Sequence, residues 1–353
     1  MRRLRIPLAL LAFLMVAGCA RPASAPPEPT AALFYAKNGE IFVSDPPGTP
    51  GRRLTSGPGD SRPAPSPDGT RVAYIHQTGD DEPGGELRVL DIASGQSRRL
   101  VDPAAVTPRF ADEAGNVDWP RWSPTGDRVA FLKASFAGGG FLSAADADTG
   151  ALTTPAEPLF ADERYAWSSD GTRIVWAGGR SDVSPVDVNI WAVGAENRAV
   201  VTDTNAYSVT FNGDSVLFTN GDATQNGFAA IPFALRAAGI YEVKPGGTPE
   251  QLLAGGYYSD IAALDSGALA FTEGRDDSEV TDITIRDRDG TARTVAEATR
   301  GAQGPVWSGD SVAYVGTADG KPLLVKKGDA DARQVDTGVD SFAWAGGSGQ
   351  TGG

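Results

Sequence analysis

The chain has 353 residues, with 45 acidic and 31 basic residues, a formal net charge of −14, one cysteine and one histidine. This composition excludes an intrachain disulfide and the usual zinc sites, which need several His and Cys ligands. It also argues against nucleic acid as a partner, because phosphate binding needs clustered cations. The 44 glycines and 25 prolines, with no long helical pattern, predict an all-β fold of many short strands joined by turns.

Residues 1–18 are predicted to be a secretory signal peptide. Three arginines among the first five residues precede an apolar stretch over residues 6–17, which is too short to span a membrane. The stretch ends in LMVAGC at Cys19, which resembles a bacterial lipobox. The resemblance implies cleavage between Gly18 and Cys19 and a lipid on Cys19. It would anchor an extracytoplasmic domain to the cell membrane, or to the outer membrane where one exists. An ordinary signal peptide is the alternative.

Three further segments are expected after the cleavage site. Residues 19–30 are rich in Pro and Ala and read as an extended tether between the lipid and the domain. Residues 31–346 would form the folded domain, and residues 347–353, GSGQTGG, are predicted to be disordered. Removal of the signal peptide, residues 1–18, takes three arginines away, so the excess of acidic over basic residues rises from 14 to 17. The simplest reason for this charge is solubility.

A motif of a tight turn followed by an apolar strand recurs along the domain. It reads SPDGTRVAYI at 66–75, SPTGDRVAFL at 123–132 and SSDGTRIVWA at 168–177. Weaker copies stand at 212–219, 265–272 and 308–315. A period of roughly 40–55 residues with several short strands in each repeat predicts a β-propeller.

A seventh copy is predicted to be divided between the two ends of the domain. The apolar run Leu33-Phe34-Tyr35 has no first strand before it, and Phe342-Ala343-Trp344 has no second strand after it. We expect residues 341–345 to supply the innermost strand of the blade formed by residues 33–56. That pairing would close a seven-bladed ring and remove open sheet edges. A six-bladed ring is the alternative.

Aspartates in the recurring turns are predicted to serve the turns themselves. In Pro-Asp-Gly at 67–69, proline fixes φ and glycine tolerates a positive φ. Asp68 and Asp170 can then accept hydrogen bonds from the turn backbone. The pairs Asp146/Asp148 and Asp287/Asp289 could supply calcium oxygens, but we interpret them as solvated turns, and we expect no metal or other cofactor.

The SPDG-turn repeat is similar to the TolB-like β-propeller repeat over most of residues 31–345. The resemblance implies a propeller and a broad role in the cell envelope. TolB-type propellers usually have six blades, whereas the copies here number seven. The separate N-terminal domain of TolB has no counterpart between the lipobox and the first blade.

The sequence lacks the motifs of the enzymes that use such propellers. The related peptidases add an α/β-hydrolase domain with a G-x-S-x-G elbow, which does not occur here. A Ser-His-Asp triad would have to use His76, which we expect at the end of a second strand. Sialidase Asp-boxes place one residue between Asp and Gly, whereas Asp68-Gly69 and Asp170-Gly171 are adjacent. We therefore expect a protein that is not an enzyme.

Long loops are predicted to gather on the face opposite the SPDG turns, where binding residues usually lie. They cover residues 76–86, 102–118, 134–140, 178–188, 220–239 and 273–281. The acidic candidates there are Asp80, Asp81, Glu82, Asp182, Asp187, Asp222, Asp276, Asp277 and Glu279. An arginine set for a carboxylate sugar could come from Arg109, Arg180, Arg236 and Arg275. Phe228 and Phe233 belong to an apolar run that forms either a lid or an exposed contact site.

The leading interpretation is a lipid-anchored, non-catalytic propeller that scaffolds or senses another envelope component, such as a protein, through its long-loop face. The membrane would be contacted through the lipid on Cys19. One alternative is an extracytoplasmic hydrolase or lyase that acts on a glycan or peptide in the central channel. A second alternative is a solute-binding module. Convergent carboxylates or arginines at the channel mouth would favour the enzyme.

Overall fold

The computed structural model describes residues 31–77, 85–102, 106, 117–134, 140–157, 159–179, 186–221, 238–274, 279–300 and 303–346. These ranges contain 28 β-strands and no helix. Within them, nothing helical is long and apolar enough to cross a membrane. The signal peptide and the tether lie outside the described residues. The all-β class is therefore confirmed for the part of the chain that forms the domain.

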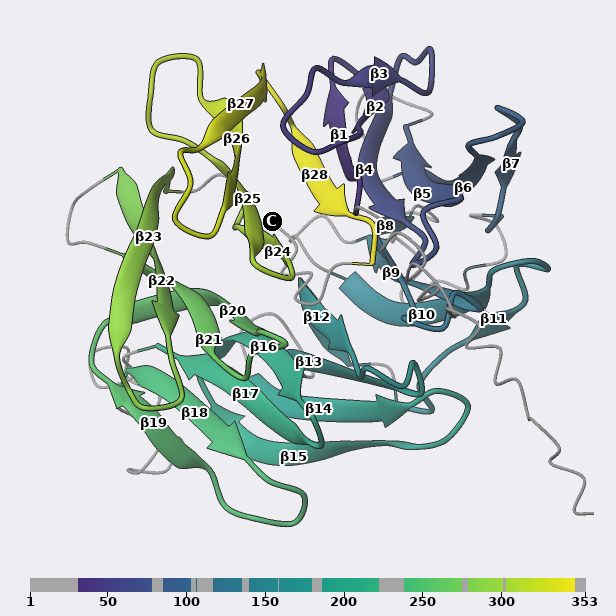
Figure 1. Ribbon diagram of the computed structural model, residues 1–353. Helices are drawn as coiled ribbons and strands as arrows, with labels where there is room; N and C mark the ends of the chain where they lie inside the picture. Colours follow the sequence, from purple (N-terminus) through teal and green to yellow (C-terminus); the bar gives the residue numbers. More distant parts are fainter. Residues whose placement is uncertain are drawn as a thin grey trace, which may run out of the picture. The chain divides into compact units, whose positions relative to one another are not determined.

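The first three sheets come from the two ends and the first half of the domain (Figure 1). One contains β28 (Ser341–Trp344), β1 (Leu33–Lys37), β2 (Glu40–Ser44) and β3 (Arg52–Arg53). The next contains β4 (Asp60–Pro65), β5 (Arg71–His76), β6 (Glu86–Asp91) and β7 (Ser97–Arg99). An eight-stranded sheet follows, with β8 (Val117–Trp122), β9 (Arg128–Ala134), β10 (Gly140–Asp146), β11 (Leu152–Thr153), β12 (Phe160–Trp167), β13 (Arg173–Gly179), β14 (Val186–Ala192) and β15 (Asn197–Thr204).

Three further four-stranded sheets complete the domain. The first contains β16 (Ala206–Asn212), β17 (Ser215–Asn220), β18 (Gly239–Val243) and β19 (Glu250–Ala254). The second contains β20 (Tyr257–Ala263), β21 (Leu269–Gly274), β22 (Val280–Arg286) and β23 (Ala292–Thr299). The third contains β24 (Val306–Ser308), β25 (Ser311–Val315), β26 (Pro322–Lys327) and β27 (Arg333–Thr337).

The eight-stranded sheet consists of two halves, β8–β11 and β12–β15. They are joined where β10 pairs with β12 through Gly140 with Ala161 and Phe141 with Phe160. Divided at that pairing, the described strands form seven groups of four, and we refer to each group as a blade, numbered in chain order from β1. The same strands form six hydrogen-bonded sheets, because two of these blades share the eight-stranded sheet.

The two ends of the domain pair with each other, as predicted. β28 is antiparallel to β1, with Leu33 opposite Trp344 and Ala36 opposite Ser341 (Figure 1). The indole Nε1 of buried Trp344 donates a hydrogen bond to the carbonyl of Val306 at 2.9 Å, which ties the closing strand to blade 7. The prediction of closure by the terminal strands is therefore confirmed.

Apolar contacts between consecutive blades make up the core. Seven buried clusters occur among the described residues, and each joins two neighbouring blades, including blade 7 with blade 1. Strand β5 contributes to two of these clusters: Val72 and Tyr74 pack toward blade 1, whereas Ala73 and Ile75 pack toward blade 3. Successive side chains of a strand point to opposite faces, so a strand between two neighbours must be apolar on both faces.

The SPDG turns use their polar side chains internally. In the first turn, Asp68 accepts hydrogen bonds from the Ser66 hydroxyl at 2.6 Å and the Thr70 amide at 3.1 Å, and Gly69 has a φ of 68°. Asp170 is held in the same way by Ser168 and Thr172, and these hydrogen bonds lower its pKa from 3.8 to about 2. The interpretation of these aspartates as turn residues is confirmed.

Candidate functional site

The innermost strands begin with a break in pairing register at the face opposite the SPDG turns, which we call the loop face. The breaks lie within β4, β8, β12, β16 and β20. Arg62, Trp119 and Asp260 have φ values of 54°, 56° and 49° at three of these bulges. Such a conformation is unusual for residues other than glycine, and bulges re-aim side chains. The loop face therefore presents residues that regular strands would not place there.

Arginine and aromatic side chains meet across blade boundaries on the loop face. The Arg62 guanidinium lies 3.3 Å from the ring centroid of Trp119, and its Nε is 3.4 Å from Asp118 Oδ1. Arg164 lies 4.1 Å from the ring centroid of Tyr207. Each pair joins two consecutive blades. Contacts of this kind are electrostatically favourable and fix the direction of the guanidinium.

A cavity of about 560 Å³ opens on the loop face over blades 4 to 7, and we call it the loop-face cavity. Its lining includes Arg164, Tyr207, Tyr257, Asp260, Arg300 and Gln303. Tyr207 and Tyr257 are 46% and 60% exposed, and they are the two exposed large hydrophobic residues of the described part of the chain. Both border the same cavity, which marks it as the candidate binding site.

Asp260 lines this cavity and is buried, with 8% of its surface exposed. Its Oδ2 accepts hydrogen bonds from the hydroxyls of Ser259 at 3.0 Å and Thr272 at 2.9 Å. Its Oδ1 lies 3.9 Å from Arg164 Nε. A Cβ on Gly304 would lie 2.4 Å from Asp260 Cγ, so this approach requires glycine. The carboxylate is thus fixed by neighbours from three blades.

The cavity on the turn face, the face that carries the SPDG turns, is lined by aromatic side chains that pack between blades. A cavity of about 380 Å³ opens beside the SPDG turns and is lined by residues that include Trp122, Trp167 and Phe211. The indole nitrogens of Trp122 and Trp167 donate hydrogen bonds to Ala64 O at 2.8 Å and Arg121 O at 3.2 Å, both on the preceding blade. These aromatic residues are therefore committed to blade packing.

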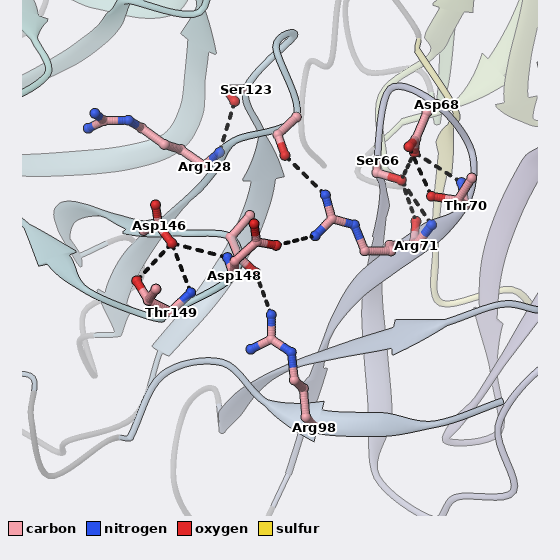
Figure 2. A network of polar contacts seen from close by, with 12 residues as sticks. Ser66, Asp68, Thr70, Arg71, Arg98, Ser123, Arg128, Asp146, Asp148 and Thr149 are labelled. Atoms are coloured by element: carbon pink, nitrogen blue, oxygen red, sulfur yellow. Dashed lines mark hydrogen bonds and ion pairs between the residues drawn. The ribbon is translucent and has the colours of Figure 1, made fainter. Parts of the chain in front are cut away.

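Arg71 joins blades 2 and 3 at the turn face, as Figure 2 shows. It donates to Asp148 Oδ1 at 3.0 Å and to the Gly126 carbonyl at 3.1 Å, and its guanidinium lies 4.6 Å from the Trp122 ring centroid. Arg173 makes two of these three kinds of contact between blades 4 and 5: it donates to Asp214 Oδ1 at 3.0 Å, and its guanidinium lies 5.2 Å from the Phe211 ring centroid. Arginine contacts thus link neighbouring blades at two boundaries of the turn face.

The aspartate pairs considered for calcium behave as turn residues. Asp146 Oδ1 accepts the amide of Thr149 at 2.8 Å (Figure 2), and Asp289 accepts the amide of Thr291 at 2.9 Å. Asp148 is the partner of Arg71. In the ranges that the structure describes, no group of three His, Cys, Asp or Glu residues could hold a metal ion.

Most residues predicted from the long loops and the N-terminus lie outside the described residues. They are Gly18, Cys19, Asp80, Asp81, Glu82, Arg109, Arg180, Asp182, Asp222, Phe228, Phe233, Arg236, Arg275, Asp276 and Asp277. Two predicted residues are described. Asp187 lies on β14, where its carbonyl accepts Asn189 Nδ2 at 3.2 Å, and the Glu279 carbonyl accepts the Arg300 amide at 2.8 Å. The proposed assembly of the other residues at the loop face stays a prediction.

The single histidine is paired with a buried carboxylate. His76 is the last residue of β5, as predicted, and its Nδ1 lies 2.7 Å from Asp60 Oδ1. Asp60 is buried at the start of β4. The pair therefore ties the two strands together at the loop-face end of blade 2.

Sequence reasoning missed the residues of the loop-face cavity. One signal was present for Arg164: it stands four residues before the turn serine of its repeat, and Arg62 and Trp119 hold the same position in theirs. A long polar or aromatic side chain at that repeated position departs from the apolar pattern of the inner strands. Tyr207, Tyr257 and Asp260 lie in weaker repeats, so the same alignment would not have selected them.

No protein-family profile matches the chain. Among solved structures, TolB from Acinetobacter baumannii is similar over 89% of this chain and 66% of that chain, with 15% identity and a TM-score of 0.52. The tricorn protease matches over 89% of this chain and 34% of its own, with 14% identity and a TM-score of 0.62. An oligogalacturonate lyase in complex with manganese matches over 87% and 84%, with 14% identity and a TM-score of 0.55.

These similarities concern the fold. The chain spans just under two thirds of the TolB chain and about a third of the tricorn protease chain. The neighbours have different activities on one architecture, and a fold alone does not determine function. The predicted TolB-like β-propeller is therefore confirmed as a fold.

Proposed function

We propose that this protein is a lipid-anchored, extracytoplasmic binding propeller, not an enzyme, and that it recognises another component of the cell envelope at the loop face. The observation that carries the proposal is that both exposed tyrosines, Tyr207 and Tyr257, border one cavity. Tyrosine supplies contact area at low cost in conformational entropy, which suits recognition. The lipobox around Cys19 and the likeness to the TolB fold support a place in the envelope.

The state of Asp260 favours binding over hydrolysis or lyase chemistry in this cavity. Asp260 is the one acidic residue among the described residues that line it. Two hydroxyls and Arg164 already surround its carboxylate. A general acid or base has to reach the proton that it transfers, whereas a carboxylate held in this way is suited to fixing an arginine.

The proposal is tested with the full-length protein as bait for detergent-solubilised envelope. The double variant Tyr207→Ser/Tyr257→Ser should lose the component that the wild-type protein captures, with an unchanged unfolding midpoint. The matched control is Thr70→Ala/Thr172→Ala, two exposed turn-face residues, and it should capture normally. Normal capture by the tyrosine variant, or loss in the control alone, would contradict the proposal.

The anchor is tested separately. Cys19→Ala should abolish metabolic labelling with a fatty acid and release the protein from the membrane fraction. Cys19→Ser serves as a second variant of nearly the same size. Retained labelling in either variant would show that the lipid is not on this residue.

A further inference from the structure

The closing strand β28 is held to the other strands of blade 1 by non-covalent contacts alone. Each of the other six blades takes its four strands from one continuous stretch of chain, whereas blade 1 combines β28 with β1, β2 and β3. β28 pairs with β1 on one edge, and its other edge has no partner among the described strands. Proteins open locally where few contacts have to be broken. The connectivity of this ring therefore favours the release of β28 as its first opening.

Gln303, which precedes β24 of blade 7, takes the place of a neighbouring strand for β28. Its Nε2 donates a hydrogen bond to the Phe342 carbonyl at 2.6 Å, and its Oε1 accepts one from the Phe342 amide at 2.7 Å. Two residues of paired strands exchange the same two hydrogen bonds. Phe342 is buried, and buried backbone groups without a partner cost free energy. Gln303 therefore fixes β28 from the side of blade 7.

Single hydrogen bonds link the inner strands at two other blade boundaries. The Ile261 amide of blade 6 donates to Ser208 Oγ of blade 5 at 3.2 Å, and the Arg62 amide of blade 2 donates to Ser341 Oγ of blade 1 at 3.0 Å. Each serine accepts one hydrogen bond from the next blade, whereas the Gln303 side chain makes two to a single residue. A two-point clamp thus holds the strand that closes the ring.

The segment that contains Gln303 is also a wall of the loop-face cavity. Gln303, Gly304 and Pro305 line the cavity. Gly304 lies against Asp260 of blade 6, since a Cβ on Gly304 would come within 2.4 Å of the Asp260 Cγ. Residues 303–305 therefore border the cavity, blade 6 and the closing strand at once. A ligand that contacts this wall meets the same segment that holds β28.

We propose that residues 303–305 couple recognition in the loop-face cavity to closure of the ring. An occupied cavity holds Gln303 against Phe342 and makes the release of β28 less favourable. Release of β28 in turn leaves Gln303 without its two hydrogen bonds, loosens the blade 7 wall of the cavity and weakens binding. The two effects are equal in free energy, because coupling between sites is reciprocal. The inference rests on the proposed binding role of the loop face and adds how binding there is regulated.

Hydrogen exchange of the full-length protein, followed by mass spectrometry, tests the clamp without a ligand. Gln303→Met keeps the length of the side chain and removes both hydrogen bonds. It should speed exchange in β1, and in β28 at residues other than Phe342, by about tenfold or more, and it should leave β5 unchanged. Ser208→Ala is the matched control, because it removes the hydrogen bond from Ile261 at another boundary. It should speed exchange in β20 and not in β28. If Gln303→Met does not fold, Gln303→Glu, which keeps the acceptor for the Phe342 amide, should still speed exchange in β28.

The same measurement on the immobilised full-length protein, with and without detergent-solubilised envelope, tests the coupling. The captured component should slow exchange in β28 of the wild type by at least about fivefold, the lower end of typical coupling between sites. It should leave β7, an outer strand of blade 2, unchanged. The slowing should disappear in Gln303→Met, and Tyr207→Ser/Tyr257→Ser should show none.

Three results would each overturn the coupling: unchanged exchange in β28 of Gln303→Met, equal acceleration in all strands of that variant, or a bound component that leaves exchange in β28 unaltered. Its failure differs from failure of the proposed function. If the component is captured through the tyrosines but exchange in β28 does not change, the loop face remains the binding surface and the coupling is wrong. Capture that survives the double tyrosine change would remove the proposed function and the coupling with it.

Discussion

The two mouths of the propeller are built from the same inner strands and differ in where their polar groups find partners. At the turn face, Ser66, Asp68 and Thr70 hydrogen-bond within one turn, and Arg71 reaches only the next blade. At the loop face, Arg164 and Asp260 come from blades 4 and 6 and meet beside Tyr207 of blade 5. Local, repeated bonding stabilises the ring, whereas the convergence of unlike residues from several blades forms the candidate binding site.

The bulges explain how an inner strand can pack regularly at its turn-face end and present unusual side chains at its loop-face end. The turn-face ends of β4, β8 and β12 pair regularly and carry Trp122 and Trp167 into blade contacts. The loop-face ends break register, and positive φ values at Arg62, Trp119 and Asp260 turn side chains away from the regular pattern. Strained backbone of this kind is found at functional sites more often than elsewhere. Stability and recognition should therefore respond to different substitutions.

The largest expected effect is a loss of unfolding free energy when the closing strand β28 is altered. Trp344→Ala removes a buried ring and the hydrogen bond to Val306, and should lower the free energy of unfolding by about 3–5 kcal/mol. Deletion of residues 340–353 removes β28 and should cost more. Trp344→Phe keeps most of the ring and should cost less than Trp344→Ala. Urea unfolding measures all three, and an unchanged midpoint in the deletion would contradict closure by β28.

The next effect is a loss of stability in acid that comes from the turns. Hydrogen bonds from Ser168 and Thr172 depress the pKa of Asp170 to about 2, and those from Ser66 and Thr70 depress the pKa of Asp68. A depressed folded-state pKa gives stability that is present above the unfolded value of 3.8 and lost as pH falls toward the folded value. Urea midpoints should fall between about pH 4 and about pH 2.

The variant Asp68→Asn/Asp170→Asn checks the source of this acid effect. It should be less stable than the wild type near neutral pH and should show a smaller decrease in acid, because two of the titrating turn carboxylates are gone. An acid decrease as large as that of the wild type would place its origin outside these turns.

A smaller effect is expected from the blade-to-blade contacts of the turn face. Arg71→Ala removes the ion pair with Asp148 and the stacking on Trp122, and should cost about 1 kcal/mol of unfolding free energy. Asp148→Ala should remove less, because the aromatic contact remains. Equal losses in both variants would show that neither the stacking on Trp122 nor the hydrogen bond to the Gly126 carbonyl contributes.

The smallest effect on stability should accompany the clearest effect on recognition. Tyr257 is 60% exposed, so Tyr257→Ala should change the free energy of unfolding by less than about 0.5 kcal/mol. The same change should weaken capture of the envelope component. Thermal unfolding and capture are measured on one preparation, and a stability loss without a binding loss would make Tyr257 a structural residue.

The sequence predicts the fold well because its strongest signals are local. The order Ser66-Pro67-Asp68-Gly69 defines a turn by its own chemistry, and an incomplete repeat at each end leads directly to the pairing of β1 with β28. The loop-face cavity depends on strand bulges and on side chains far apart in the sequence. Arg164 and Asp260 are separated by about a quarter of the chain, and no local pattern relates them.

Site-specific photocrosslinking in intact cells tests the central claim most directly, because it asks which mouth touches a partner. A photoreactive amino acid replaces Tyr257 at the loop face in one strain and Thr172 at the turn face in another. We predict adducts from position 257 and only background labelling from position 172. Adducts from position 172 with none from position 257 would contradict the assignment of recognition to the loop face.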